Sequence, residues 1–555
     1  MNSMSGEQDR QDERNEQTPI NQLPDEILCD IFLLNTQKDG DEENPHSPLA
    51  TLLSTGEVCR RWHDVASNYP MLWSRIIDFE RHHPDFIADL LRRSKTSLFA
   101  VGGDSVFKAV QLRDPRAKTV LQSIFEHRLR IQTLSLNIRL APWEFICQNF
   151  LKHPAPTLEY LNLVTSCPFP DCLYAGPLFS DEAPHLQRLH LQRCLIDFSS
   201  CALHNLTELS VMDIVAPTIL SLRVPDHPLK VAPTVMGWLR VLENIPSLRC
   251  LTLSGAISSS PGSEEESMFT VALPHLLFLT VGAKFNDAAN FLEHLDVPAS
   301  CGIRTRLTCN RSASGLARSK LLAFLNRQLT EWRRDAPDRY LQAKILSGDR
   351  IHFGNSRRVG YIWDMTEEEL IKEHTSNSTD PLLWLVVSFD DSQDTLDFFK
   401  LLLSLYEPTY PTTTMLDLWI DEEFAAINND STPFPSLDSL QSFTAVKVLN
   451  LLGRSPLYLL PLFQSASLLP LLLFPTLRSL RLTRTNFEID QRATYFAIVG
   501  FLLWRLEVHA PIMEVYNLEG RISKETQESL ARTGNVRVTH GTMKYGHLEN
   551  ASDEE

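Results

Sequence analysis

A short pattern of aliphatic residues recurs along most of this chain and restricts its fold more than any other feature. The pattern is L-x-x-L-x-L, with any aliphatic residue allowed at the leucine positions, and successive copies mostly start 20 to 33 residues apart. The L-x-L part turns two side chains into a core and leaves the residue between them on the opposite face of a short strand. Copies begin at Ile131, Leu158, Leu186, Leu206, Leu248, Leu276, Leu382, Met415, Val446, Leu477 and Leu503. The sequence therefore predicts many short strands that can stack in parallel.

Segments such as HLQRLHLQRCL and TLRSLRLTRTN resemble the strand segment of leucine-rich repeats, which have a period of about 20 to 29 residues. The resemblance implies an α/β fold, in which an irregular leucine-rich-repeat solenoid carries parallel strands on its concave face and helices and loops on its convex face. The long step from Leu206 to Leu248 has room for a degenerate repeat near Ile219. The alternative interpretation is an α/β domain with scattered Leu-x-Leu strands.

The pattern lapses between Leu276 and Leu382. Apolar residues at helical spacing predict an amphipathic helix over 316–332, and the segment 344–354 alternates like a strand on either side of a Ser-Gly turn. We therefore expect a repeat domain over 129–535 that contains an irregular insertion near 300–380.

A second informative stretch covers 20–73. Pro24 suits the first turn of a helix, where its missing N–H would be unpaired in any case, and the acidic residues Asp25 and Glu26 suit the positive end of the helix dipole. A second amphipathic helix is expected around Trp62. Segments shorter than about 40 to 60 residues rarely bury enough surface to fold alone, so we expect some of these apolar side chains to serve a partner.

The pieces LPDEILCDIF and EVCRRWHDVASNYPMLW resemble the F-box motif, in the form found in the expanded fungal F-box families. The resemblance implies that residues 20–79 dock a Skp-type adaptor and, through it, a cullin scaffold. The residues expected to bind the adaptor are Leu23, Pro24, Ile27, Leu28, Ile31, Phe32, Leu52, Val58, Cys59, Trp62, Leu72 and Trp73. The alternative is that these helices are ordinary core helices of an α domain.

An acidic insertion departs from the F-box pattern. Residues 35–48 are poor in apolar side chains and include Asp39, Asp41, Glu42 and Glu43. The middle helix of the family would then start near Leu49. Elsewhere, composition predicts a disordered tail at 1–19, a helical linker at 80–128 and a disordered acidic tail at 536–555.

Composition and missing motifs exclude several classes of function. A net charge of −17 argues against a general nucleic-acid binder, because neutralising phosphates requires an excess of Lys and Arg. The N-terminus lacks the apolar core of a signal peptide, and the apolar stretch 455–477 is cut by four prolines, so we expect a cytoplasmic or nuclear protein that does not use a membrane. No C-x-x-C, phosphate-binding or catalytic motif occurs, and we expect no metal, no cofactor and no enzyme activity.

One basic segment stands out in this acidic protein. Residues 304–339 contain nine Lys and Arg residues against three acids. Such runs are commonly solvated helix faces balanced by neighbouring acids. The sharper hypothesis is a site for an acidic or phosphorylated substrate segment at Arg304, Arg306 and Arg311, since arginine forks bind carboxylate and phosphate bidentately.

Two functions from different classes follow from the sequence. The first is the substrate-recognition subunit of a Skp-adaptor/cullin/F-box ubiquitin ligase, which would bring an unknown protein target to ubiquitination and proteasomal degradation. The second is a non-catalytic leucine-rich-repeat interaction scaffold with no role in ubiquitin transfer.

Overall fold

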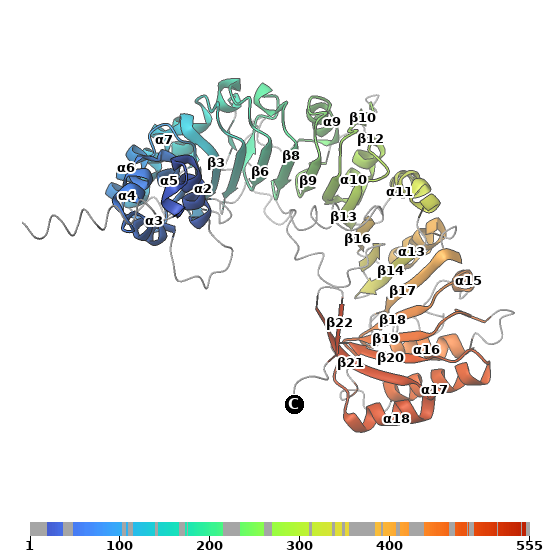
Figure 1. Ribbon diagram of the computed structural model, residues 1–555. Coiled ribbons are helices and arrows are strands. Elements are labelled where there is room, and N and C mark those ends of the chain that lie inside the picture. The colour runs from blue at the N-terminus through green and yellow to red at the C-terminus, as the bar shows by residue number, and fades with distance from the viewer. Residues whose placement is uncertain are drawn as a thin grey trace, which may run out of the picture. The chain divides into compact units, whose positions relative to one another are not determined.

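The chain forms two compact units, 1–231 and 232–555, in a computed structural model (Figure 1). The structure describes residues 19–36, 48–102, 107–108, 115–138, 143–165, 173–174, 176–214, 233–259, 269–309, 314–335, 339–346, 350–354, 383–389, 392–406, 411–420, 438–465, 472–485, 487, 493–518, 520–544 and 547–550. The predicted disorder at 1–18, the acidic residues 39–43 and the degenerate repeat near Ile219 lie outside these residues.

The first unit begins with a group of short helices. These are η1 (Pro19–Gln22), α2 (Asp25–Asn35), α3 (Pro48–Gly56), α4 (Arg60–Asn68), α5 (Pro70–Arg75) and α6 (Pro84–Arg93). Helix α2 starts directly after Pro24, as predicted, and packs against α3, α4 and α5. The middle helix α3 starts at Pro48, one residue before the position expected. The centre of the group is filled by Leu28, Phe32, Leu52 and Leu72, which are at most 2% exposed.

A parallel sheet follows in the same unit. Strands β1 (Phe99–Val101) and β2 (Phe107–Lys108) both pair with β3 (Ile131–Ile138), which is followed in order by β4 (Tyr160–Thr165), β6 (Arg188–Gln192) and β8 (Glu208–Met212). The intervening elements are α7 (Pro115–Glu126), η2 (Arg128–Arg130), α8 (Trp143–Ile146), η3 (Cys147–Leu151), β5 (Leu173–Tyr174), η4 (Leu178–Asp181), β7 (Leu195–Ile196) and η5 (Cys201–Leu203). The sheet thus starts inside 80–128, which was predicted to be a purely helical linker.

The leucine pattern corresponds to a repeated arrangement of a turn followed by a strand. Leu134, Leu161, Leu189 and Leu209 stand in register on four neighbouring strands, and each is fully buried. The first leucine of several copies closes a tight turn by donating its N–H to the carbonyl three residues earlier. Proline occupies the second position of these turns, where its fixed φ fits, at positions 156, 184, 246, 274 and 475.

The turns that follow the strands of this repeated pattern are equally regular. Five strands are followed directly by a residue with φ between 53° and 59°, and these residues are Arg193, Asp213, Gly255, Gly453 and Arg484. Where the hydrogen bond is seen, the N–H of this residue donates to the neighbouring strand, as Gly453 does to the Thr483 carbonyl at 2.9 Å. The chain therefore leaves the sheet through a left-handed turn, which costs a residue other than glycine some strain.

The second unit contains a longer sheet. Its strands, in spatial order, are β9 (Cys250–Ser254), β11 (Phe278–Lys284), β13 (Gly302–Cys309), β16 (Leu383–Phe389), β15 (Arg350–Gly354), β14 (Arg339–Leu346), β17 (Thr413–Ile420), β18 (Val448–Leu452), β19 (Ser479–Thr483), β20 (Glu514–Leu518), β21 (Arg537–Lys544) and β22 (His547–Asn550). A separate pair joins β10 (Val271–Ala272) to β12 (Leu295–Asp296).

Helices accompany these strands. They are α9 (Val235–Glu243), α10 (Phe285–Glu293), α11 (Gly315–Asp335), α13 (Ser392–Tyr406), α15 (Asp438–Gln441), α16 (Ser455–Ser465), α17 (Ala493–Glu507) and α18 (Lys524–Gly534). Helices α16, α17 and α18 lie together along one side of strands β18 to β21 (Figure 1). The mixed α/β class with a large parallel sheet is confirmed. Among the described residues, no helix is long and apolar enough to cross a membrane.

The predicted insertion coincides with the break in strand order. Strands β14 and β15 form an antiparallel pair that lies between β16 and β17, although both precede β16 in the chain. Helix α11, which was expected over 316–332, occupies 315–335. Elsewhere in this sheet each strand pairs with the next one along the chain. The leucine pattern lapses here because β14 and β15 do not follow that order.

Two sequence predictions are wrong. The copy of the pattern at Leu503 is not a strand but part of α17, which packs against α16 and α18. Leu503 itself is 41% exposed, and the next strand in the chain is β20. The segment from 536 onward was expected to be disordered, yet β21 pairs in parallel with β20 and antiparallel with β22. Pairing to an existing strand edge orders a polar segment that could not bury a core of its own.

Candidate protein-binding site on the N-terminal helices

The residues predicted to bind the adaptor divide into a buried set and a surface set. Leu28, Phe32, Leu52, Leu72 and Trp73 are buried. Leu23, Pro24, Ile27, Ile31, Val58, Cys59 and Trp62 are exposed or half-buried. The buried set builds the helical group, and only the surface set can meet a partner without unfolding it.

Helix α2 has an apolar face that points away from its own core. Ile27, Ile31 and Leu34 follow one another at i, i+4 and i+7 and are exposed or half-buried, on the side next to the buried Leu28 and Phe32. Ile27 is 44% exposed and Leu34 is 62% exposed. A helix face of this composition is costly to leave in water, which is typical of a surface that a partner covers.

The segments that pack against α2 carry further exposed apolar side chains. Leu53 on α3 is 52% exposed, Val58 before α4 is 58% exposed and Met71 on α5 is 43% exposed. The motif resemblance did not single out Leu34 or Met71 as adaptor contacts. The sequence does indicate that Leu34 belongs to this face, since it continues the i, i+4, i+7 spacing of Ile27 and Ile31.

Arg61 fixes the start of α4 against the start of α2. Its Nε and Nη2 donate to Asp25 Oδ1 at 3.1 and 2.6 Å, and Nη2 also donates to the Leu23 carbonyl at 2.5 Å. This clamp brings the connection before α4, which carries Val58, to the end of α2 that carries Leu23 and Pro24. Phe32 and Trp62 add a ring contact between the same helices, with centroids 5.2 Å apart.

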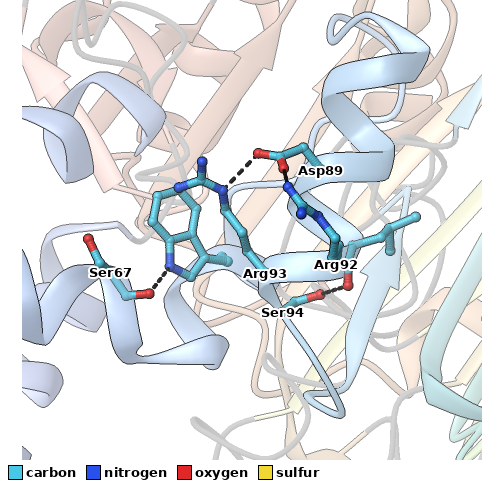
Figure 2. A network of polar contacts seen from close by, with 7 residues as sticks. Ser67, Asp89, Arg92, Arg93 and Ser94 are labelled. Atoms are coloured by element: carbon cyan, nitrogen blue, oxygen red, sulfur yellow. Dashed lines mark hydrogen bonds and ion pairs between the residues drawn. The ribbon is translucent and has the colours of Figure 1, made fainter.

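Trp73 belongs to the internal packing of the first unit. Its indole N–H donates to the Ser67 carbonyl at 3.2 Å, and the guanidinium of Arg93 lies 4.7 Å from its ring centroid. Figure 2 shows how Arg93 is held in turn by Asp89 of the same helix, at 2.7 Å, with Arg92 bound to the other carboxylate oxygen. The hydrogen bond from Arg92 is the largest cause that lowers the pKa of Asp89. The motif tryptophan therefore ties α5 to α6.

A second arginine continues this connection to the sheet. Arg130 donates to the carbonyls of Ser97 and Leu91 at 3.0 and 3.2 Å and to Ser94 Oγ at 2.5 Å, and it lies over the ring of Phe99. These contacts join the end of α6 to β1. The helical group is thus continuous with the first strand of the sheet.

The basic segment 304–339 is distributed over different elements, mainly strand β13 and helix α11. Arg304 and Arg306 lie on β13 and alternate with the buried Thr305, while Arg311 lies outside the described residues. Three cations of α11 have partners within the chain. Arg318 pairs with Asp394 at 2.6 Å, Lys320 pairs with Glu293 at 2.8 Å, and Arg327 donates to the Leu295 carbonyl at 2.5 Å. This supports the interpretation that α11 is a balanced helix face.

The site offers contact surface rather than reactive groups. Burial raises the pKa of the Cys29 thiol, with smaller contributions from Asp25, Asp30 and Glu26, so this cysteine is an unreactive core residue. The described residues contain no group of His, Cys, Asp and Glu side chains that could hold a metal ion.

Together, these features define a small helical docking module joined to a parallel sheet. Comparison with known families agrees, because residues 20–78 match the model of the F-box-like family. The chain therefore contains an F-box-like domain. No curated protein matches the chain.

Proposed function

We propose that this protein is the substrate-recognition subunit of a Skp-adaptor/cullin/F-box ubiquitin ligase, acting in the cytoplasm or nucleus without catalytic activity of its own. The observation that most directly supports adaptor binding is that four apolar side chains of the F-box-like domain are between 44% and 62% exposed. They are Ile27, Leu34, Leu53 and Val58. Fully burying one such side chain contributes about 1.5 to 3 kcal/mol. Several together supply a large part of the free energy of a specific complex, after the costs of association.

We further propose that the sheet belongs to the leucine-rich-repeat class and presents the target. The segment 186–196 follows the extended repeat pattern, with Leu186, Leu189, Leu191, Cys194 and Ile196 at its positions. Cys194 is fully buried and donates its thiol to the Leu163 carbonyl of the neighbouring strand at 3.4 Å. A buried hydrogen-bonding side chain at this position supports the turn that leaves the strand.

The face of the first sheet opposite the leucines is a candidate target surface. The guanidinium of Arg188 lies over the ring of Tyr160, 4.6 Å from its centroid. The ring of His190 makes an edge contact with the same tyrosine, and its Nε2 bonds Glu208 at 2.7 Å. Rigid aromatic and arginine side chains of this kind dominate protein interfaces. Arg304 and Arg306 on β13 remain our proposed contacts for an acidic or phosphorylated target, together with Arg311, and charge reversal at these positions should remove targets while leaving adaptor binding intact.

The competing proposal is a scaffold that holds an adaptor without ubiquitin transfer. Affinity purification of the tagged chain with mass spectrometry separates the two, because a receptor brings down both adaptor and cullin. A scaffold brings down the adaptor alone or neither.

The same experiment tests the docking surface with a double variant, Ile27→Glu with Val58→Glu. We expect it to lose adaptor and cullin together, since charged groups cannot be desolvated in an apolar interface. The matched control is Leu129→Glu with Leu316→Glu, two side chains outside the F-box-like domain that are 54% and 68% exposed. If both variants bind the adaptor like the wild type, the proposed surface is wrong.

A further inference from the structure

The second unit carries a line of basic side chains at the edge where its last parallel strands begin. The residue before β18 is Lys447, the residue before β19 is Arg478, the residue before β20 is Met513, and β21 starts with Arg537. Backbone hydrogen bonds join them in order across this edge, with Arg537 in register with Glu514, the residue after Met513. The N–H of Arg478 donates to the Lys447 carbonyl at 2.9 Å, that of Met513 to Arg478 at 2.8 Å, and that of Arg537 to Met513 at 3.0 Å. We call these four residues the basic rim.

The charge of the basic rim is only partly compensated, by Glu514 beside Arg537. The four connecting segments, 444–447, 475–478, 510–513 and 534–537, contain no Asp or Glu. Lys447 and Arg478 are exposed, and their side chains make no ion pair with any residue that the structure describes. The Arg537 side chain is 78% exposed, and the carboxylate of Glu514 is 4.0 Å away. In the first unit the matching positions are Glu159, Gln187 and Thr207, so the fold itself does not require cations there.

A buried arginine adds positive charge beneath the rim. Arg505 of α17 is fully buried and donates only to backbone carbonyls, those of Leu473, Phe474, Leu477 and Ala510, at 2.7 to 3.4 Å. Burial lowers the pKa of this guanidinium to about 10, so it is still charged at neutral pH. Leu477 and Ala510 lie in the rim segments. Among the described residues no carboxylate pairs with Arg505, so its positive charge is met only by the dipoles of these backbone carbonyls, two of which belong to rim segments.

The centre of the rim is apolar. Met513 is 58% exposed and stands between Arg478 and Arg537. Methionine is flexible and polarisable, and it adapts to the side chains of different partners. Cations around an exposed methionine form a surface with two kinds of affinity, one for negative charge and one for an apolar side chain.

We propose that the basic rim binds an acidic peptide segment of a protein partner, with carboxylates facing Lys447, Arg478 and Arg537 and one apolar side chain of the peptide covering Met513. Charge complementarity favours this occupant, because neighbouring strands lie about 4.8 Å apart and several carboxylates of one segment can meet the three cations. This inference is independent of adaptor binding.

Fluorescence anisotropy with the full chain tests the proposal. The probe is a labelled twelve-residue peptide of Asp and Glu with one central Leu, measured at about 50 and about 200 mM salt because screening weakens exposed charge pairs. The variant Lys447→Glu, Arg478→Glu, Arg537→Glu should raise Kd at least about tenfold. The control variant Arg81→Glu, Lys118→Glu, Lys152→Glu makes the same change of charge at exposed sites of the first unit and should shift Kd no more than about threefold.

A second pair of probes isolates the apolar contact. Met513→Ser should weaken binding of the Leu peptide several-fold and leave binding of a peptide with Ser in place of Leu unchanged. Unfolding measurements on every variant show whether the fold is kept. The proposal is overturned if the wild type fails to bind the Leu peptide at low salt, if both triple variants lose affinity equally, if Met513→Ser affects both peptides alike, or if a single-stranded oligonucleotide of equal charge binds more tightly.

Discussion

Arg61 and Asp25 join the two helices that carry most of the F-box motif. Two guanidinium nitrogens of Arg61 donate to one carboxylate oxygen of Asp25, at 3.1 and 2.6 Å. The pair is 36 residues apart in sequence, and the Asp25 side chain is 64% exposed. An exposed ion pair contributes little to stability, so we infer that its main effect is to set how Leu23 and Val58 are presented.

The first prediction concerns this pair. Arg61→Met should lower the free energy of unfolding by at most about 1 kcal/mol. It should weaken adaptor binding more clearly, because the surface formed by the two helices loses its fixed geometry. Arg60→Met, at the neighbouring exposed position, is the matched control. Isothermal titration of both variants checks this, and equal affinities for the adaptor would contradict the clamp.

The second prediction separates core from surface within the motif. Trp73→Ala should lower the free energy of unfolding by about 3 to 5 kcal/mol, since it removes a buried ring and its contact with Arg93. Ile27→Ala should change stability by less than about 1 kcal/mol and weaken adaptor binding. Denaturant unfolding and titration are measured on both. A Trp73→Ala protein with wild-type stability would show that the packing described for α5 and α6 is wrong.

The third prediction concerns the acidic insertion. Replacing 38–46 with a Gly/Ser segment of the same length should leave adaptor binding within about threefold of the wild type, because a polar connection adds little to either helix. The replacement spares Thr36, which is buried and donates its hydroxyl to the Leu33 carbonyl at 3.0 Å, and Pro48, which begins α3. A complete loss of binding would mean that the acidic residues contact the adaptor.

The fourth prediction tests the left-handed turns. Gly453 has φ 59°, and an added Cβ would meet nothing closer than Trp419 Nε1 at 3.8 Å. Gly453→Ala should therefore cost about 1 kcal/mol through the backbone alone. Gly315→Ala is the control, because an added Cβ has nothing within 4 Å and alanine favours the helix that starts there. Thermal unfolding should show a lower Tm for the first variant only.

The fifth prediction concerns pH. Burial lowers the pKa of His127 below its usual 6.5, and the charge of Arg130 lowers it further. The unfolded chain therefore binds this proton more tightly than the folded chain. Stability should be constant above about pH 6.5 and fall as the pH drops through the folded pKa. His127→Gln should flatten the dependence of the free energy of unfolding on pH in that window, and an unchanged slope would rule out His127 as its source.

Much of the sheet could be predicted because its signal is local. Two buried leucines on every strand must alternate with outward residues, and this period is visible in any one copy of the pattern. Leu503 shows where this fails. The same spacing of aliphatic residues also occurs in a helix, where it need not mark the buried face: in α17, Ile498 and Leu502 are buried and Leu503 is 41% exposed. The turns at Pro156 and its equivalents are local features as well, each closed by a hydrogen bond over three residues.

The sequence by itself determined that residues 20–73 form short helices with more apolar surface than they can bury, because proline, acidic residues and apolar spacing act within one or two helical turns. It could not determine which apolar residues stay exposed. Trp73 and Ile27 belong to the same motif, yet Arg93 covers Trp73 while Ile27 faces water. Contacts with residues distant in sequence decide this, and so does the basic rim, whose members come from strands brought side by side only by the sheet.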